Sequence, residues 1–391
     1  MLSPELKQFI SQHLTDQTDK LLLGAPRYPG IDVPVAVGQI SIRKQIKEKL
    51  PDWYVNPDLF FPSGIAAEQC SSSATALYKQ SLLHGDKVCD LTGGLGVDTY
   101  YFSQKAKEVT YVERFPEYCE AAGNNFKALQ ANNIRIINGD AREIAATLEA
   151  DTFYIDPARR DGCNKRLFAL TDCEPDVTQL KTQLLSKARR LLIKVSPMAD
   201  ISETLRILPE TKEVHIVAVK NECKEILFAL EPGTTGAEPA IFTVNYTSNG
   251  TIQTFTFRTG EEKEAHLHLA SGVKKYLYEP NAALLKGGAF KLAAVRFGLE
   301  KLHQHSHLYT SDLLVEDFPG RRFLVENSEP FSGKLLKQTG KQIGQANITT
   351  RNFPLSVAEI RKRSSIKEGG TDYLFATTLA NGEKTIIRCT K

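Results

Sequence analysis

The chain has 391 residues, of which 41% are hydrophobic and 24% charged. This composition is typical of soluble globular proteins, and the length predicts two to four domains. Its net charge of +3 combines a basic segment, residues 281–391 with 17 Lys and Arg against 10 Asp and Glu, with a mildly acidic remainder. The sequence shows no apolar run long enough to cross a bilayer, no secretory signal and no C-x-x-C pair, which predicts a cytoplasmic protein with reduced thiols.

The first 60 residues predict mainly helical structure. Apolar residues recur at helical spacing in residues 4–14 and 40–50, and prolines between residues 51 and 62 then break the chain into turns. A second helical stretch, residues 68–83, follows. We therefore expect an N-terminal helical region at residues 1–66.

From residue 87 onward, short β-rich runs alternate with helical runs. The expected strands are residues 87–91, 108–113, 134–138, 152–155 and 191–195, with helices at 98–104, 117–130 and 178–188. This alternation predicts an α/β fold with a doubly wound parallel sheet and helices on both of its faces. The carboxyl ends of such strands share the edge where open sheets bind ligands.

Two further β-rich runs, residues 214–219 and 225–230, lie too close together for a parallel crossover and predict an antiparallel hairpin. Five parallel strands followed by a terminal antiparallel hairpin is the order of a class I methyltransferase sheet. A dinucleotide dehydrogenase usually has another order. We therefore expect a class I methyltransferase domain at residues 67–275.

Shorter, mixed elements follow this domain. Residues 241–246 and 251–257 predict another hairpin, and small α+β domains are expected at residues 276–324 and 325–391. The basic charge of this part favours a polyanionic partner. An ordinary solvent-exposed surface that binds no partner explains the charge equally well.

A glycine-bearing turn follows the first expected strand, in Asp90-Leu91-Thr92-Gly93-Gly94-Leu95-Gly96. Gly94 and Gly96 permit positive φ and let a ligand approach backbone N–H groups, and the helix that follows favours an anionic group at its N-terminus. Such a turn alone is weak evidence, but its place at the start of a βαβ unit strengthens it. Asp90, Thr92, Gly94 and Gly96 are therefore expected to bind a cofactor.

Acidic residues end the next two strands. Glu113 can accept two hydrogen bonds from ribose hydroxyls, and Asp140 can accept one from an adenine amino group. The sequence fingerprint of dinucleotide-binding proteins has a third small residue at the position of Thr99. The acid on the third strand and the late hairpin also fit S-adenosylmethionine better than a nicotinamide cofactor. We therefore expect S-adenosylmethionine as the cofactor.

The fourth strand ends in Tyr154-Ile155-Asp156-Pro157-Ala158-Arg159-Arg160-Asp161, beside the expected position of the sulfonium methyl. This block resembles the D-P-P-[YFW] motif of amino-directed methyltransferases on nucleic acids, with Ala158 and Arg159 where Pro and an aromatic residue usually stand. In that motif the Asp accepts hydrogen bonds from the target amine, and the aromatic ring stacks on the base.

The resemblance implies that Asp156, Pro157 and Arg159 are catalytic, because an arginine plane can also stack on a base. Arg160 is then expected to contact the substrate. A salt bridge to an acidic neighbour is an equally good expectation for both arginines.

Segments on either side of this block resemble one family. Residues 68–79 (EQCSSSATALYK) lie upstream and residues 221–225 (NECKE) downstream, with ITTRNFP at 348–354 and GGTDYLFA at 369–376. Together they look like a bacterial group of class I S-adenosylmethionine-dependent methyltransferases with a THUMP-like C-terminal domain, distantly similar to trimethylguanosine synthases. The resemblance runs from about residue 35 onward, and residues 278–324 look like the group's ferredoxin-like module.

THUMP domains bind RNA, so the resemblance implies tRNA or rRNA as substrate, methylated at a base nitrogen by direct in-line transfer. It also implies that Ser72 or Thr75 bonds the cofactor carboxylate, unless this helix only packs. Asn221 is a candidate for the substrate wall. Four basic residues are candidates for binding the phosphate backbone, namely Arg351, Arg361, Lys362 and Arg363. For the last three, the alternative is a solvent-exposed helix face with no partner.

Five histidines lie two residues apart in two runs, at positions 266, 268, 303, 305 and 307. We expect them on a solvated strand or loop, without a metal. No cysteine follows the fifth strand, which disfavours a covalent mechanism. Two rival functions are a methyltransferase acting on a small molecule or protein, and a non-catalytic RNA-binding or assembly factor.

Overall fold

The computed structural model describes residues 2–159 and 170–391, which form two compact units. Unit 1 comprises Met1–Glu213 and Glu225–Ala237, and unit 2 comprises Val214–Lys224 and Glu238–Lys391. Within the described ranges, every helix is too short or too polar to cross a membrane.

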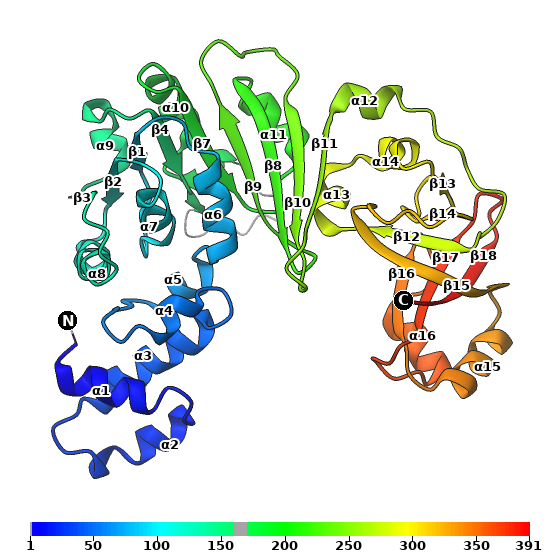
Figure 1. The fold of residues 1–391 in the computed structure, drawn as a ribbon, viewed down its shortest axis with the longest axis horizontal. Helices are drawn as coiled ribbons and strands as arrows, with labels where there is room; N and C mark the ends of the chain where they lie inside the picture. The colour runs from blue at the N-terminus through cyan, green and yellow to red at the C-terminus, as the bar shows by residue number, and fades with distance from the viewer. Residues whose placement is uncertain (1, 160–169) are drawn as a thin grey trace. The chain divides into compact units, whose positions relative to one another are not determined.

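Unit 1 begins with a helical region (Figure 1). Proline stands in the first turn of three of its helices, where the missing backbone N–H leaves no hydrogen bond unmade. Buried side chains such as Phe9, Leu21 and Val33 form a core cluster between the first three helices. The helices are α1 (Pro4–Gln12), α2 (Thr18–Leu23), α3 (Val33–Ile46), α4 (Pro51–Val55) and α5 (Gly64–Gln69), with a 3-10 turn, η1, at Ala25–Arg27.

The helix expected over residues 68–83 is two helices in the structure. α5 ends at Gln69, and α6 spans Ser73–Ser81. The Ser72 hydroxyl accepts a hydrogen bond from the Thr75 backbone N–H at 3.2 Å, and Thr75 Oγ1 accepts one from the Ser72 N–H at 3.1 Å. This capping box starts a new helix and so explains the interruption.

The main sheet contains the five expected parallel strands. β1 pairs in parallel with β2 and β4, β2 with β3, and β4 with β7. β4 is buried along its whole length, as a strand covered on both faces should be. The strands are β1 (Lys87–Asp90), β2 (Glu108–Glu113), β3 (Ile134–Asn138), β4 (Thr152–Ile155) and β7 (Arg190–Val195).

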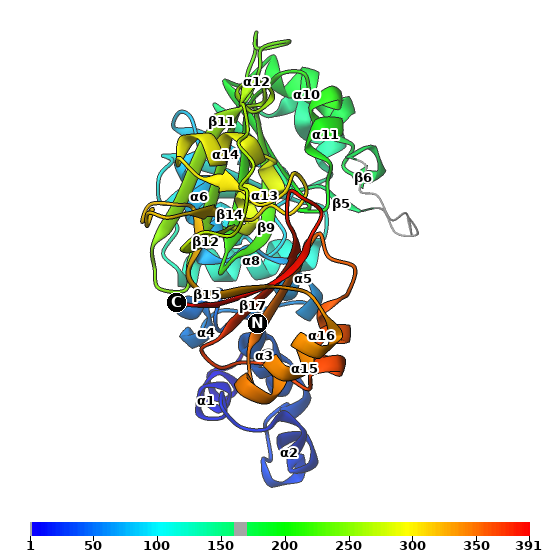
Figure 2. The ribbon, with the colours of Figure 1, turned by 90° about the vertical axis from the view of Figure 1, so that its right-hand side faces the viewer.

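Helices cover both faces of this sheet, which confirms the doubly wound fold. Figure 2 shows α6 on one side and α10 and α11 on the other. A two-residue ladder, β5 (Ala158–Arg159) with β6 (Cys173–Glu174), follows β4. The remaining helices and turns of the unit are α7 (Val97–Ser103), α8 (Pro116–Ala128), α9 (Ala141–Ile144), η2 (Ala145–Thr147), η3 (Leu170–Asp172), α10 (Val177–Leu185) and α11 (Ile201–Ile207).

The expected terminal hairpin is formed by β8 (Thr211–Val219) and β9 (Glu222–Leu230). β9 is antiparallel to β7, with Ile226 opposite Val195. The strand order is β11-β10-β8-β9-β7-β4-β1-β2-β3, so the class I order is confirmed. A second hairpin, β10 (Ala240–Tyr246) with β11 (Ile252–Arg258), extends the sheet by two strands that the sequence did not place there.

Unit 2 contains a second sheet with the order β13-β14-β12-β15-β18-β17-β16. The strands are β12 (Tyr276–Pro280), β13 (Glu300–Lys301), β14 (Tyr309–Ser311), β15 (Gly320–Pro330), β16 (Asn347–Arg351), β17 (Tyr373–Thr378) and β18 (Lys384–Thr390). The helices are α12 (Thr259–Glu264), α13 (Ala282–Gly287), α14 (Phe290–Arg296), α15 (Gly333–Ile343) and α16 (Val357–Ser364).

The long strand β15 belongs to both halves of this sheet. Its residues 320–324 pair with β12, and its residues 324–330 pair with β18. The domain boundary expected between residues 324 and 325 therefore lies inside a strand, and one sheet carries both expected C-terminal domains.

Candidate active site

The glycine turn between β1 and α7 lines a cavity of about 410 Å³ in unit 1. Gly96 has a φ of +78°, and a Cβ added there would lie 2.6 Å from the Phe126 ring. A Cβ on Gly93 would lie 2.1 Å from the ring of Tyr111. The turn therefore requires glycine at both positions, and Gly93 joins the expected Gly94 in the lining.

Asp90 stabilises this turn through hydrogen bonds of its carboxylate. Its side chain is almost completely buried, Oδ1 accepts from the Thr92 N–H at 3.0 Å, and Oδ2 accepts from Thr99 Oγ1 at 2.6 Å. Burial raises the pKa of the Asp90 carboxyl to about 7. Thr92 also reaches the next strand, because its hydroxyl accepts from the Asp156 N–H at 2.7 Å.

Glu113 faces the cavity from the end of β2. Its Oε2 accepts from the Gly94 N–H at 2.9 Å, and its Oε1 accepts from the Phe115 N–H at 3.0 Å. An ionised carboxylate has about four acceptor positions. The two oxygens can therefore still accept hydrogen bonds from a diol.

Asp140 also lines the cavity, but it already has a strong partner. Its Oδ1 accepts from the backbone N–H of Arg142 at 2.9 Å and from Arg142 Nε at 3.0 Å. The hydrogen-bonded Arg142 side chain holds the pKa of Asp140 below its ordinary value. Arg142 in turn pairs with Glu174 of β6 at 2.7 Å. An adenine amino group would have to share Asp140 with this arginine.

A buried polar network includes Asp98 and Ser71, which both line the cavity. Asp98 Oδ2 accepts hydrogen bonds at 2.9 Å from Tyr154 Oη and from Ser71 Oγ. Asp98 Oδ1 lies 3.2 Å from Lys79 Nζ and forms no hydrogen bond within the described part of the chain. Lys79 is fully buried and bonds both carboxylate oxygens of Glu225, at 2.9 and 3.0 Å.

The serines of the 70–75 segment are placed differently from the expectation. Ser71 lines the cavity, whereas Ser72 and Thr75 are absent from its described lining. The hydroxyls of Ser72 and Thr75 form the capping box of α6, which explains why they are not presented to the cavity.

Asp156 directly follows β4 and lines the cavity together with Lys194 of β7. The Lys194 ammonium donates a short hydrogen bond to Asp156 Oδ2. Burial alone would lower the pKa of Lys194, but the Asp156 carboxylate, with two more distant acids, raises it above its ordinary value. Sequence reasoning missed Lys194, although a lone lysine in the apolar strand Arg190–Val195 is a usable signal.

Of the described residues after Asp156 in this block, Ala158 lines the cavity. Pro157 is buried and is not among the residues that line the cavity. Arg159 lies in β5 with its backbone paired to Cys173. Arg160, the expected substrate contact, lies outside the described residues.

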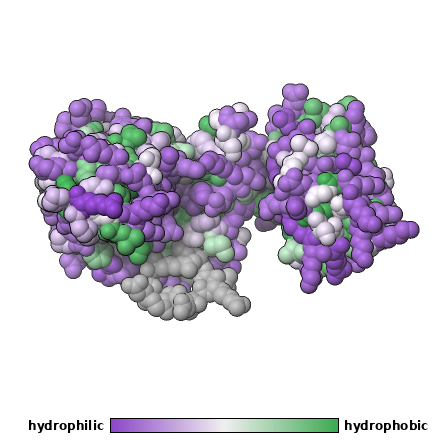
Figure 3. Space-filling model, turned by 90° about the horizontal axis from the view of Figure 1, so that it is seen from below, coloured by the Kyte–Doolittle hydropathy of each residue, from purple (hydrophilic) through white to green (hydrophobic). Residues whose placement is uncertain are grey.

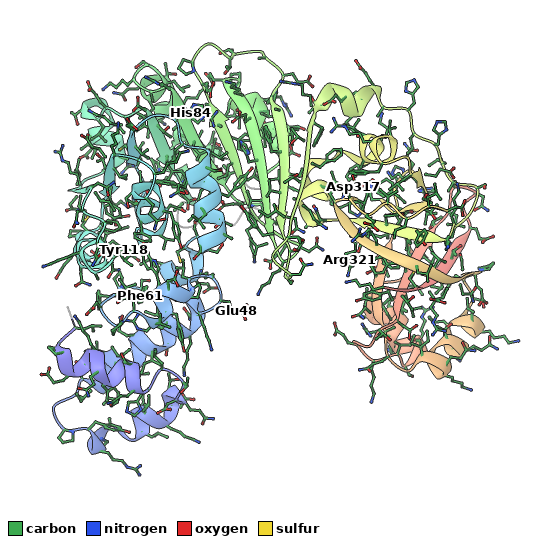
Figure 4. The ribbon with its side chains drawn as sticks, viewed as in Figure 1. Glu48, Phe61, His84, Tyr118, Asp317 and Arg321 are labelled. Atoms are coloured by element: carbon green, nitrogen blue, oxygen red, sulfur yellow. The ribbon has the colours of Figure 1, made fainter. Side chains whose placement is uncertain are left out.

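The cavity is electrically negative. Tyr118 of α8, labelled in Figure 4, and Phe115 add aromatic surface to its wall. The described ionisable lining consists of six acids and two bases, namely Asp90, Asp98, Glu113, Asp140, Asp156 and Glu174 with Arg114 and Lys194. Such a cavity fits a cationic ligand, and Asp98, whose Oδ1 already forms an ion pair with Lys79, places a carboxylate in its lining. Its volume is that of a small-molecule site.

The remaining expected residues lie in unit 2. Asn221 is used internally, since its N–H donates to Asn245 Oδ1 at 3.0 Å and its Oδ1 accepts from the Ala282 N–H at 2.8 Å. Arg361 donates to the carbonyls of residues 346 and 366, both at 3.2 Å. Arg351 pairs with Glu279 at 3.0 Å, whereas Lys362 and Arg363 are exposed.

His266, His268 and His305 are exposed, whereas His303 and His307 are half-buried. His307 stacks on Phe290 with ring centroids 3.8 Å apart, and His303 Nδ1 lies 3.0 Å from Asn352 Nδ2. Among residues 2–159 and 170–391, no group of three His, Cys, Asp or Glu side chains is arranged to hold a metal ion.

Comparisons with known proteins agree with this geometry. A ferredoxin-like domain family matches residues 276–319, and a THUMP domain-like family matches residues 320–391. A crystal structure of a candidate methyltransferase from Porphyromonas gingivalis W83 shares 38% identity, with a TM-score of 0.88 over 99% of this chain and 97% of that one.

Curated relatives match part of the chain. Ribosomal RNA small subunit methyltransferase J of Rhodopseudomonas palustris (strain HaA2) is 28% identical over 161 residues, which cover 36% of this chain and 72% of that protein. An uncharacterized RNA methyltransferase of Clostridium tetani is 28% identical over 195 residues, which cover 44% of this chain and 42% of that protein.

Proposed function

Because the chain belongs to the family of class I S-adenosylmethionine-dependent methyltransferases with a THUMP-like C-terminal domain, we propose that it methylates a base amine of RNA. The observation that carries this proposal is the single cavity onto which the acids at the ends of β1, β2 and β4 all open. Asp90, Glu113 and Asp156 thereby join a cofactor site to a candidate acceptor for the target amine.

In this proposal, Glu113 accepts hydrogen bonds from the cofactor ribose, Asp140 faces the adenine, and Asp98 accepts from the methionine ammonium. When bound, S-adenosylmethionine supplies an activated methyl group on a sulfonium. The negative lining favours this cation over the neutral thioether that remains after transfer.

Asp156 then orients the target. Its carboxylate accepts a hydrogen bond from the amine and points the nitrogen lone pair along the line of transfer. Lys194 is a positioning residue, because its ammonium holds Oδ2 of Asp156 and leaves Oδ1 for the amine. After transfer the cationic, methylated nitrogen is acidic and loses its extra proton to solvent water, so no strong base is needed.

Three observations support RNA as the substrate. The C-terminal segment matches a THUMP domain-like family, and both curated relatives above are named RNA methyltransferases. Exposed basic side chains also follow the outer sides of α15 and α16, at Lys334, Lys337, Lys341, Lys362 and Arg363. Such residues contact phosphates and supply affinity with little sequence information. Figure 3 shows that hydrophilic side chains dominate one face of the molecule.

A cytoplasmic location is part of the same proposal. The six described cysteines are all free thiols, which supports a reducing compartment.

The test of the function is nucleoside mass spectrometry of RNA from a strain lacking the gene, beside the wild type. We expect one methylated base to be missing, and we expect wild-type protein to restore it. An RNA nucleoside profile that is the same in both strains would overturn RNA as the substrate.

Replacing Glu113 with alanine is expected to weaken S-adenosylmethionine binding by about 10- to 100-fold. The loss corresponds to about 1.5–3 kcal/mol for hydrogen bonds to a charged group, and the Gly94 N–H also loses its acceptor. Isothermal titration calorimetry measures the change. Glu117→Ala is the matched control, since Glu117 is an exposed acid in the first turn of α8 and does not line the cavity. Equal affinities for the two variants would contradict the assignment.

A further inference from the structure

A second hollow, of about 820 Å³, lies wholly within unit 2. We call it the amide groove, because five side-chain amides line it. They are Asn221 in the turn of the β8–β9 hairpin, Asn245, Asn249 and Gln253 in the β10–β11 hairpin, and Asn281 at the start of α13. We propose that the amide groove holds the phosphodiester backbone of a single-stranded segment of the substrate RNA. This inference rests on the proposed function.

The floor of the amide groove is a closed hydrogen-bond network. Asn245 Nδ2 and Asn281 Nδ2 both donate to Gln253 Oε1, at 3.0 and 3.1 Å. Gln253 Nε2 donates to the Gly320 carbonyl at 3.0 Å, and Asn281 Oδ1 accepts from the Leu284 N–H at 2.9 Å. These amides hold the groove in shape, and their bonding groups are already used within the protein.

The rim of the groove is basic. Four basic side chains line it against one acidic side chain, namely Lys220, Arg321, Arg322 and Lys391 against Glu316. Even Glu316 binds a cation through its backbone, since its carbonyl accepts a short hydrogen bond from Arg322. This excess of positive charge attracts phosphates, with little opposing charge to repel them.

Arg321, labelled in Figure 4, is held in place from behind. Its Nε donates to Glu279 Oε2 at 2.8 Å, and Arg351 Nη2 donates to the other oxygen, Oε1, at 3.0 Å. Glu279 is buried, with 4% of its side chain exposed. A buried carboxylate shared by two arginines fixes both guanidinium groups and so reduces the entropy lost on binding an anion.

The chemistry of the groove favours the backbone over the bases. The described residues that line it include no aromatic side chain on which a base could stack. The side-chain oxygens of all five amides already accept hydrogen bonds within the protein. They are therefore engaged and do not serve as acceptors for base amino groups. A hollow of this volume takes a few nucleotides of single strand and is far too small for a duplex.

The test uses fluorescein-labelled oligouridine and oligoadenosine of ten nucleotides, with binding followed by polarisation at several salt concentrations. Arg322→Ala and Lys220→Ala are each expected to lower the slope of log K against log salt by about 0.7, the loss of one contact to single-stranded phosphate. Arg322→Lys should keep the wild-type slope. Lys263→Ala is the matched control, because Lys263 is an exposed base of unit 2 outside the groove.

The inference is overturned if Arg322→Ala and Lys220→Ala keep the wild-type slope. It is overturned equally if wild-type protein binds neither oligonucleotide, or prefers one of them more than tenfold, since that preference would mean base reading. The proposed function is judged separately by the nucleoside profile of the deletion strain. Circular dichroism of each variant establishes that its fold is retained.

Discussion

Asp156→Ala is expected to slow methyl transfer by about 10²–10³-fold while S-adenosylmethionine binds almost as before. The rate falls because the target amine loses the acceptor that orients it, an effect of the size seen when one positioned hydrogen-bonding group is removed from an active site. Cofactor binding persists because the contact between residue 156 and the glycine turn is made by the backbone N–H, which alanine keeps.

The measurement pairs single-turnover methyl transfer to RNA with calorimetric titration of the cofactor. Asp86→Ala is the matched control, since Asp86 is an exposed acid just before β1, at the strand end away from the cavity. Full activity in Asp156→Ala would remove this residue from the mechanism. Lost cofactor binding in the same variant would move it from the target to the cofactor site.

Variants of Lys194 test whether this residue only positions Asp156 or contacts the substrate directly. Lys194→Met should lower the rate constant of transfer more than it changes the affinity for RNA, because it frees the Asp156 carboxylate to turn. Lys194→Arg keeps a cation beside Oδ2 and should restore part of the rate. If arginine rescues nothing and methionine costs nothing, Lys194 has no positioning role.

The sequence was sufficient to predict the parallel sheet and the acids on its edge. Both depend on local signals, since strand periodicity and a residue at a strand end are readable in a few neighbouring positions. Glu113 and Asp156 were found in this way, and both line the cavity.

Contacts between residues far apart in the chain could not be predicted from the sequence. Lys194 is hydrogen-bonded to Asp156, which lies 38 positions away in the chain. The residues around each of them give no local signal that the two side chains pair. Arg142 is hydrogen-bonded to Asp140, only two positions away. The sequence nevertheless did not decide between this bond and a carboxylate that is free to bind the cofactor. Ser72 and Thr75, which were expected from the sequence at the cofactor carboxylate, instead cap α6. This outcome depended on where α6 begins, and helix ends are the least predictable part of an element.

Lys79→Met is expected to lower the free energy of unfolding of unit 1 by about 3–5 kcal/mol, the usual loss when one partner of a buried ion pair is removed. Lys79 is fully buried and bonds Glu225 and Ser71. Burial already raises the pKa of Glu225. Without the ammonium, this carboxyl must either stay charged without its closest partner or take up a proton, and both alternatives cost free energy.

Urea unfolding followed by tryptophan fluorescence measures this loss, because the chain has one tryptophan, Trp53, which is buried in unit 1 in the same core cluster as Ala76 of α6. Lys87→Met is the matched control, since Lys87 pairs with Glu108 on the surface at 3.8 Å, and such pairs contribute about 0–1 kcal/mol. The double variant Lys79→Met, Glu225→Met removes the ammonium and its closest carboxylate, leaves Asp98 without its ion-pair partner, and should recover part of the loss. A double variant as unstable as Lys79→Met would show that the cost comes from lost packing, and the buried charge pair would then not be what joins α6 to β9.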